Sequence, residues 1–345
     1  MNYLKYHGKG LTGLVNLGNT CYINSSLQVI SHIPELNIYI HNFLKTQNLN
    51  EIKNIDIIFL HEWIELYKLM WKKNVIISPN RFLRVIQTIS QEKKNILFSG
   101  FMQNDSTEFI YFIIQIFHNA LQHAPDKNNL LQLILNQYQN DKHFSKFLLN
   151  HHKNEYSMVD SLFAIYTKID IIDYDNENVL SSNYENFYIL DLAITQLSIE
   201  DCLNDYFNDE LMNKENDNQY FCDKDNKLKD VVKRTSIYHC PDYLIIQLKR
   251  WNQNLKKNQR IIHYNINTLD LDPYLHDSSP FKQNSNYSLF GIINHSGNVF
   301  GGHYFSFIKN FNNNWYEFND TTVKEIHITK LLSNKNYCFI YRRNK

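Results

Sequence analysis

The sequence predicts an α+β fold, in which a helical N-terminal part precedes a part built of antiparallel strands. Residues 106–121 repeat apolar side chains at helical spacing, whereas the chain after residue 158 alternates apolar and polar side chains in short runs. Helices followed by a set of strands are typical of α+β proteins. No long linker rich in Pro, Gly or Ser divides the 345 residues, so we expect one cooperative domain over residues 1–345.

The helical part begins with residues 23–33, whose apolar side chains gather on one side after a turn at residues 18–20. Residues 52–71 carry a second apolar stripe at helical spacing. The segment 78–80 opens a further helix, with its proline in an early position where helices tolerate it. The strongly apolar helix predicted over residues 106–121 is expected to lie at the centre of this part.

The second part is predicted to form the sheet. Runs rich in β-branched and aromatic residues indicate strands at 162–172, 187–193, 231–239, 243–248, 287–294, 303–309 and 315–318. Among them, residues 201–211 are predicted to form a short helix that starts after Ser198.

Composition and charge exclude several classes of function. Lys+Arg and Asp+Glu both number 35, so charge does not point to a nucleic-acid or membrane-surface partner. The longest apolar run, residues 109–117, is too short to cross a bilayer, and residues 1–10 lack the apolar core of a signal peptide. Five cysteines without such a signal indicate reduced thiols in an intracellular protein, cytoplasmic, nuclear or both. We expect a monomer.

Cys21 is the candidate nucleophile because it stands at the start of a predicted helix. A thiol attacks as a thiolate, and a helix N-terminus with a neighbouring imidazolium lowers its pKa from about 8.5 by several units. The free N–H groups at a helix start favour negative charge, so the Cys21 N–H can face the oxygen of a carbonyl under attack. Asn16 can add a side-chain N–H to the same oxyanion. A cysteine alone is more often a small buried hydrophobe, so the assignment depends on its partners.

His303 is the candidate base and acid. It follows two glycines, and Asn319 and Asp320 beyond it offer an amide and a carboxylate that can orient the imidazole. The order Cys, His, then Asn or Asp, with the cysteine early, is the order of papain-like proteases. The sequence leaves open which of Asn319 and Asp320 contacts His303.

Two stretches resemble the signature boxes of the ubiquitin-specific proteases. Residues 13–28 are similar to the cysteine box of that family, and residues 295–297, 302–304 and 315–320 are similar to its histidine box. Each match is without gaps, and the boxes come in the right order. Residues 243–251 also look like the palm strand of the family, although Trp251 stands where Phe is usual.

The resemblance implies a papain-like fold shaped like a right hand. A helical thumb would cover about residues 1–155, β fingers about 160–236 and a β palm about 237–345. The resemblance also implies roles for the site residues. Cys21 would be the nucleophile, His303 the base and acid, Asn16 the oxyanion donor and Asn319 the third triad residue, with Asp320 able to assist or replace it. The activity implied is deubiquitination of proteins without a cofactor.

Several residues are predicted to contact the substrate. Residues 103–109 resemble a family motif whose acidic residues meet the basic tail of ubiquitin, which ends Leu-Arg-Leu-Arg-Gly-Gly. Asp105 and Glu108 are three apart, hence on one face of the helix start, and can pair with a guanidinium; Asp105 is equally suited to capping the helix. Gly301 and Gly302 suit a narrow channel, because glycine lets another backbone approach. His295 and Tyr304 of the histidine box complete this predicted set.

No metal site is predicted. Many relatives bind zinc in the fingers through two Cys-x-x-Cys pairs, but this chain has no cysteine between 168 and 180, and Asp225 replaces the partner of Cys222. A closed zinc site needs four ligands, and one remains. The adjacent His151 and His152 lie in a polar stretch and are predicted to be solvated.

Two other functions keep the same residues. The chain can be a protease for a ubiquitin-like modifier, since several modifiers share a Gly-Gly end, or an inactive scaffold that binds ubiquitin. Asn16, Cys21 and His303 are all present, which favours the active deubiquitinase. A papain-like peptidase that does not recognise ubiquitin is the remaining alternative.

Overall fold

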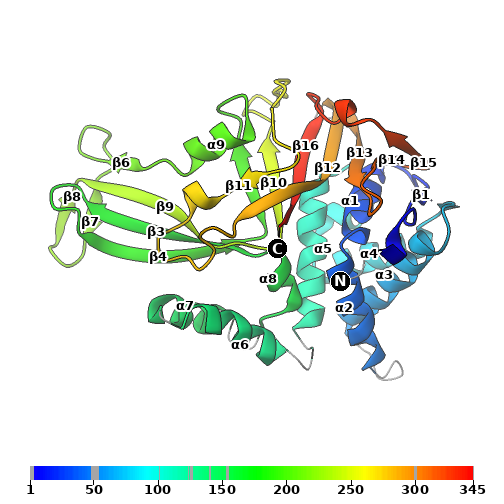
Figure 1. Ribbon diagram of the computed structural model, residues 1–345, viewed down its shortest axis with the longest axis horizontal. Coiled ribbons are helices and arrows are strands. Elements are labelled where there is room, and N and C mark those ends of the chain that lie inside the picture. The colour runs from blue at the N-terminus through cyan, green and yellow to red at the C-terminus, as the bar shows by residue number, and fades with distance from the viewer. Residues whose placement is uncertain are drawn as a thin grey trace.

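The computed structural model describes residues 4–47, 54–100, 102–122, 124, 127–139, 141–152, 155–298 and 301–344. Helices gather on one side of a central sheet, and a narrower sheet projects from the other side, as Figure 1 shows. The predicted α+β class is therefore confirmed. Within the described residues, no helix is long and apolar enough to cross a membrane.

The helical layer surrounds α5, as the sequence predicted. Eleven of the sixteen residues of α5 are buried, and the carboxylate of Asp105 caps its start by accepting from the backbone N–H of Thr107 and Glu108. The layer also contains α2, which packs against α3 and α8; this helix was not predicted, and it starts with Pro34 at its first position. The α-helices of this layer are α1 (Cys21–Ser31), α2 (Pro34–Lys45), α3 (Ile55–Lys72), α4 (Asn80–Glu92), α5 (Ser106–Leu121) and α8 (Met158–Phe163).

The central sheet has eight strands in the order β15-β14-β13-β12-β16-β10-β5, with β11 paired to β12. Its strands are β5 (Ile189–Ala193), β10 (Tyr243–Lys249), β11 (Leu269–Asp270), β12 (Asn286–Asn298), β13 (Gly301–Lys309), β14 (Trp315–Asn319), β15 (Thr322–Ile326) and β16 (Asn336–Arg343). The pairs are antiparallel except β10–β5, which is parallel and corrects the expectation of an entirely antiparallel sheet. Both faces are buried: in β10, Ile245 packs toward the helices while Leu244 and Ile246 join a second core on the other face.

The projecting sheet has the order β4-β3-β9-β6, and a separate β7–β8 hairpin lies at its far end (Figure 1). Its strands are β3 (Ile165–Asp173), β4 (Val179–Phe187), β6 (Glu210–Met212) and β9 (Val231–His239), and the hairpin is β7 (Tyr220–Cys222) and β8 (Lys227–Lys229). The helices α6 (Lys127–Gln137) and α7 (Lys142–His152) lie beneath it, and α9 (Ile199–Tyr206) lies on its other side.

Short elements complete the chain. The parallel strands β1 (Gly13–Leu14) and β2 (Ile76–Ile77) form a two-stranded sheet. The 3-10 turns are η1 (Leu4–Tyr6), η3 (Ile96–Phe98), η4 (Asp272–Tyr274) and η5 (Ile328–Lys330).

Three sequence expectations differ from the structure. The short helix ends at Tyr206 and not at residue 211, because residues 210–212 pair with β9 as β6. Residues 162–163 belong to α8 and not to the following strand; α8 starts with a capping box at Ser157. His152 is buried, with Nε2 2.6 Å from the hydroxyl of Tyr166, so the prediction that it is solvated was wrong.

Ion pairs hold the β7–β8 hairpin at the end of the projecting sheet. Nζ of Lys229 lies 2.5 Å from Asp225 of the hairpin and 3.1 Å from Asp173 at the end of β3. The thiol of Cys222 lies 3.8 Å from the same Asp225 carboxylate. One ammonium therefore joins the hairpin to the projecting sheet. Among the described residues, no group of three or more His, Cys, Asp or Glu side chains is placed to hold a metal ion.

Candidate active site

Cys21 is the first residue of α1, and a tight turn brings the chain to it. Gly18 has φ 99° and Asn19 has φ 55°, left-handed conformations that glycine and asparagine adopt at least cost. The side-chain oxygen of Asn16 accepts hydrogen bonds from the N–H groups of Gly18 and Thr20, each at 3.1 Å, and so holds the turn. The first N–H groups of a helix have no acceptor within it, so that of Cys21 is available at the site.

His303 lies on β13, the strand against which α1 packs. Its Nε2 donates to Oδ1 of Asn319 at 2.6 Å, and the imidazole also interacts with the side chain of Cys21. The interaction with Cys21 is the main reason that the pKa of His303 is raised to about 9; burial opposes the rise, and the bond to Asn319 and the charge of Asp320 add to it. A protonated imidazole beside a thiol favours the thiolate.

Asn319 and Asp320 have different contacts. The hydrogen bond to the imidazole comes from Asn319, whereas the carboxylate of Asp320 accepts from the side-chain amides of Asn16 at 3.0 Å and of Asn24 at 2.8 Å. The backbone oxygen of Asp320 also accepts from Leu14 N–H at 2.8 Å. Asp320 thus ties the loop before Cys21 to the end of β14.

The Asn16 amide is held at both ends. Its oxygen accepts the hydrogen bonds that hold the turn, and its nitrogen donates one hydrogen bond to Asp320. The second N–H of the amide can therefore donate to another acceptor. The residue is exposed at the surface, beside the start of α1. This amide and the Cys21 N–H are the two donors that the sequence predicted for an oxyanion.

Gly301 and Gly302 lie at the start of β13, next to His303. Gln103, on the loop before α5, holds the backbone of Gly302 from the helical side. Its Nε2 donates to the Gly302 oxygen at 2.5 Å, and its Oε1 accepts from the Gly302 N–H at 3.1 Å. A Cβ on Gly302 would lie 2.2 Å from Nε2 of His295, so only glycine fits there.

The two acidic residues of the predicted tail site differ in their surroundings. Asp105 uses one oxygen to cap α5 and the other to accept the hydroxyls of Tyr304 at 3.2 Å and Tyr337 at 2.5 Å. Glu108 is exposed, and partial burial and then the nearby charge of Asp105 raise the pKa of its carboxyl group. Glu108 also lines a hollow of about 430 Å³ between α5 and β5. Direct contact of either residue with a tail stays a prediction.

His295 and Tyr304 are buried, and both belong to one side-chain network. Tyr304 is bonded to Asp105, and the ring of His295 lies 4.6 Å from the ring of Tyr304 between centroids. Burial, and then the charge of Lys257, lower the pKa of His295 to about 4, so this histidine is neutral. These two residues shape the site from behind its surface, and their predicted contact with substrate stays a prediction.

Sequence reasoning missed four residues of the site. Gln103 and Asn24 stand inside the quoted motifs, where an amide near the candidate nucleophile was a usable signal. Tyr337 and Lys257 lie in segments whose pattern gives no sign that the fold carries them to His295 and Asp105.

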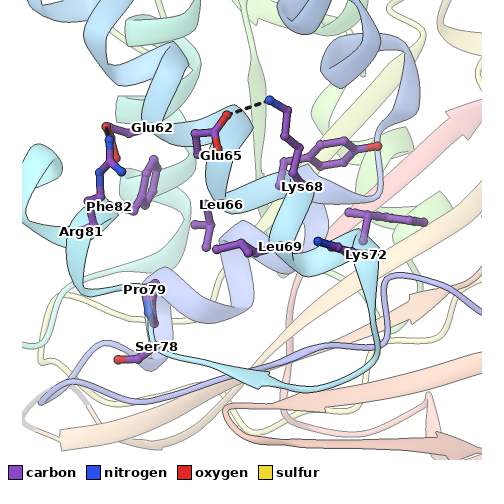
Figure 2. Close-up of a pocket in the computed structure, with 12 residues that line it drawn as sticks. Glu62, Glu65, Leu66, Lys68, Leu69, Lys72, Ser78, Pro79, Arg81 and Phe82 are labelled. Carbon is purple, nitrogen blue, oxygen red and sulfur yellow. Dashed lines mark hydrogen bonds and ion pairs between the residues drawn. The ribbon is translucent and has the colours of Figure 1, made fainter.

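A separate apolar hollow of about 680 Å³ lies on the helical side of the molecule (Figure 2). Leu66 and Leu69 of α3 face Pro79 and Phe82 at the start of α4, and charged side chains including Lys68 and Arg81 stand at its rim. None of the candidate catalytic residues lines this hollow, so it does not belong to the site.

A thiol at a helix N-terminus, next to an imidazole that an asparagine holds, is the arrangement of papain-like cysteine hydrolases. The chain belongs to the ubiquitin carboxyl-terminal hydrolase family, whose sequence profile matches residues 12–341. Ubiquitin carboxyl-terminal hydrolase 2 of Bos taurus is 25% identical over 96% of this chain and 55% of its own length. Ubiquitin carboxyl-terminal hydrolase Usp2 of Drosophila melanogaster is 29% identical over 97% of this chain and 35% of its own length. The chain thus spans about half or less of these proteins. Ubiquitin carboxyl-terminal hydrolase 2 of Gallus gallus is 26% identical over 96% of this chain and 93% of its own length.

Two solved structures share the fold. The Ubp8/Sgf11/Sus1/Sgf73 module of SAGA bound to monoubiquitin matches with a TM-score of 0.76 and 22% identity, over 98% of this chain and 70% of that one. The same module bound to ubiquitin aldehyde matches with a TM-score of 0.74 and 23% identity, over 99% and 71%.

Proposed function

We propose that this chain is a thiol-dependent deubiquitinase that cleaves the bond after the C-terminal glycine of ubiquitin. The observation that carries the proposal is the position of Cys21 at the start of α1, where its side chain interacts with His303 and Asn319 holds the imidazole. Membership of the ubiquitin carboxyl-terminal hydrolase family supports ubiquitin as the partner. No cofactor takes part in this reaction.

The chemistry follows from the two partners of His303, which are Cys21 and Asn319. The Cys21 thiolate attacks the carbonyl carbon of the terminal glycine, and negative charge develops on the carbonyl oxygen. The N–H groups of Cys21 and Asn16 donate hydrogen bonds to that oxygen, and a donor used in this way contributes about a hundred- to a thousand-fold in rate. His303 then gives its proton to the departing lysine amine as the carbon–nitrogen bond breaks.

A thioester between Cys21 and ubiquitin remains. His303, now neutral, takes a proton from water, which attacks the thioester carbon. The carbon–sulfur bond breaks and the thiolate–imidazolium pair is restored, while the new carboxyl group of ubiquitin gives its remaining proton to the solvent. Asn319 keeps the imidazole in line during both steps.

The rest of the proposal assigns parts of the chain. Residues 1–155 act as thumb, 160–236 as fingers and 237–345 as palm of a single catalytic domain. Glu108, with Asp105, meets the basic side chains of the tail, and Gly301 and Gly302 admit its two glycines. The chain acts as a monomer inside the cell, in the cytoplasm or the nucleus. A mass from light scattering that is twice the mass of one chain would contradict the monomer.

Hydrolysis of ubiquitin carrying a C-terminal fluorogenic amide tests the function. We expect turnover by the wild type and none by Cys21→Ala, with the folded state of both checked by circular dichroism. If the chain hydrolyses the fluorogenic amide of another modifier with a Gly-Gly end but not that of ubiquitin, its substrate is a ubiquitin-like protein. Binding of ubiquitin without turnover would show a scaffold.

A further inference from the structure

Lys257 reaches the site from the loop that follows β10. Its Nζ lies 3.0 Å from Nδ1 of His295 and donates to the backbone oxygen of the same residue at 2.5 Å. The side chain is half-buried and lies over the ring of Trp251, with Nζ 5.7 Å from the ring centroid. Two hydrogen bonds to one residue, together with an aromatic wall, leave this ammonium little freedom.

His295 carries the effect of Lys257 to the strand of the catalytic histidine. His295 is paired with Tyr304 across β12 and β13, and the next pair is Ser296 with His303. The imidazole of His295 fills the space in which a Cβ of Gly302 would stand. A rotation of this ring would therefore press on the backbone that immediately precedes His303.

The same contact fixes the protonation of His295. Because Lys257 is a donor, Nδ1 of His295 must be the acceptor, and the proton of the neutral ring is on Nε2. Burial, Lys257 and His303 all lower the pKa of His295, and Asp105 opposes them. Burial, and then the charges of Arg250 and Lys335, lower the pKa of Lys257 to about 8. A neutral His295 adds no positive charge next to the imidazolium of His303.

We propose that Lys257 is a positioning residue, which fixes His295 as a neutral ring beneath Gly302 and so sets the backbone beside His303 for the reaction. The proposal builds on the proposed deubiquitinase function. Lys257 touches neither the reacting thiol nor the imidazole of His303, so its effect passes through His295 and Gly302. The reaction therefore slows when Lys257 is changed, although the nucleophile is intact.

The variants Lys257→Met and Lys257→Arg test this, with Lys256→Met as the matched control. Methionine keeps the apolar part of the lysine side chain but has no hydrogen-bond donor, whereas arginine keeps a donor. Lys256 is the neighbouring residue, and its side chain is exposed. With fluorogenic ubiquitin we expect Lys257→Met to lower kcat by about 10- to 100-fold, because small misplacements of reacting groups cost that much. KM and the rate of Cys21 alkylation by iodoacetamide should stay within about threefold of wild type, and Lys257→Arg should recover most of the loss.

Two further readouts separate positioning from general stabilisation. The double variant Lys257→Met with His295→Gln should lose no more kcat than His295→Gln alone, because Lys257 acts only through His295. In ¹⁵N NMR spectra, His295 of the wild type should carry its proton on Nε2 at pH 7, and Lys257→Met should lose that preference. Equal loss in Lys257→Met and Lys256→Met, loss of alkylation in step with kcat, or an unchanged His295 tautomer would each overturn the proposal. The NMR result stands even if the wild type hydrolyses no modifier, which would refute the proposed function alone.

Discussion

Replacing Asp320 by Asn tests how the candidate oxyanion donor is held. The carboxylate accepts from Asn16 at 3.0 Å through one oxygen and from Asn24 at 2.8 Å through the other. An amide of the same shape has one acceptor oxygen, so one of the two donors must face an NH₂ group instead. Asparagine also tolerates the φ of 49° at this position, which makes it a milder change than alanine.

The size of the effect follows from the bond that is lost. A hydrogen bond to a charged group contributes about 1.5–3 kcal/mol, and about 2 kcal/mol corresponds to roughly 30-fold in a rate or equilibrium. The fall in rate cannot exceed the fall caused by losing the Asn16 donor itself, which is about a hundred- to a thousand-fold. We therefore expect Asp320→Asn to lower kcat by roughly 30- to 100-fold with KM within about threefold, because the oxyanion forms only in the transition state.

Steady-state kinetics with fluorogenic ubiquitin measures this, alongside Asn16→Ala and the double variant. Since Asp320 acts through Asn16, the double variant should lose no more kcat than Asn16→Ala alone. A rise in KM with unchanged kcat, or losses that multiply in the double variant, would refute the reasoning.

The imidazole of His303, the predicted tail site and the β7–β8 hairpin give one further prediction each. Asn319→Ala removes a bond that raises the pKa of His303, so the alkaline fall of kcat/KM, which we expect near pH 9 in the wild type, should move to lower pH; an alkaline fall at the same pH in the variant would contradict the role of Asn319 in the triad. The stability that His303 gains from its raised pKa is likewise full below about pH 6.5 and lost as pH rises through about 9. Glu108→Gln should raise KM about tenfold at constant kcat, since charge-assisted bonds to a guanidinium are lost; an unchanged KM removes Glu108 from the tail site. Lys229→Met should raise KM a few-fold and weaken its salt dependence, whereas a chelator should leave the wild type unchanged; inactivation by the chelator would show a metal.

The fold was predictable where local pattern and tertiary packing agree. The apolar period of residues 106–121 matches α5 to the residue, and residues 231–239 match β9. The parallel pairing of β5 with β10 was not predictable, because alternation tells which residues share a face and not which strand lies alongside. The helix predicted to residue 211 ends at Tyr206, because the chain beyond it pairs with β9.

The site was predictable to the extent that its residues stand in short motifs. Cys21 and His303 are 282 positions apart, and their chemistry and order were enough to predict that they meet. Asn319 and Asp320 have different contacts because β14 ends at Asn319 and the chain turns at Asp320, which has φ 49°; adjacent positions in a sequence do not reveal this. Lys257 comes to the site only through the folding of a loop between distant strands.

Labelling by ubiquitin that carries a C-terminal thiol-reactive group tests the central claim most directly. Wild type and Cys21→Ala are mixed with the probe at neutral pH, and intact mass is measured. The account predicts a gain of one ubiquitin in the wild type and none in the variant. A folded wild type that alkylates with iodoacetamide but takes up no ubiquitin, or a variant that is still labelled, would contradict it.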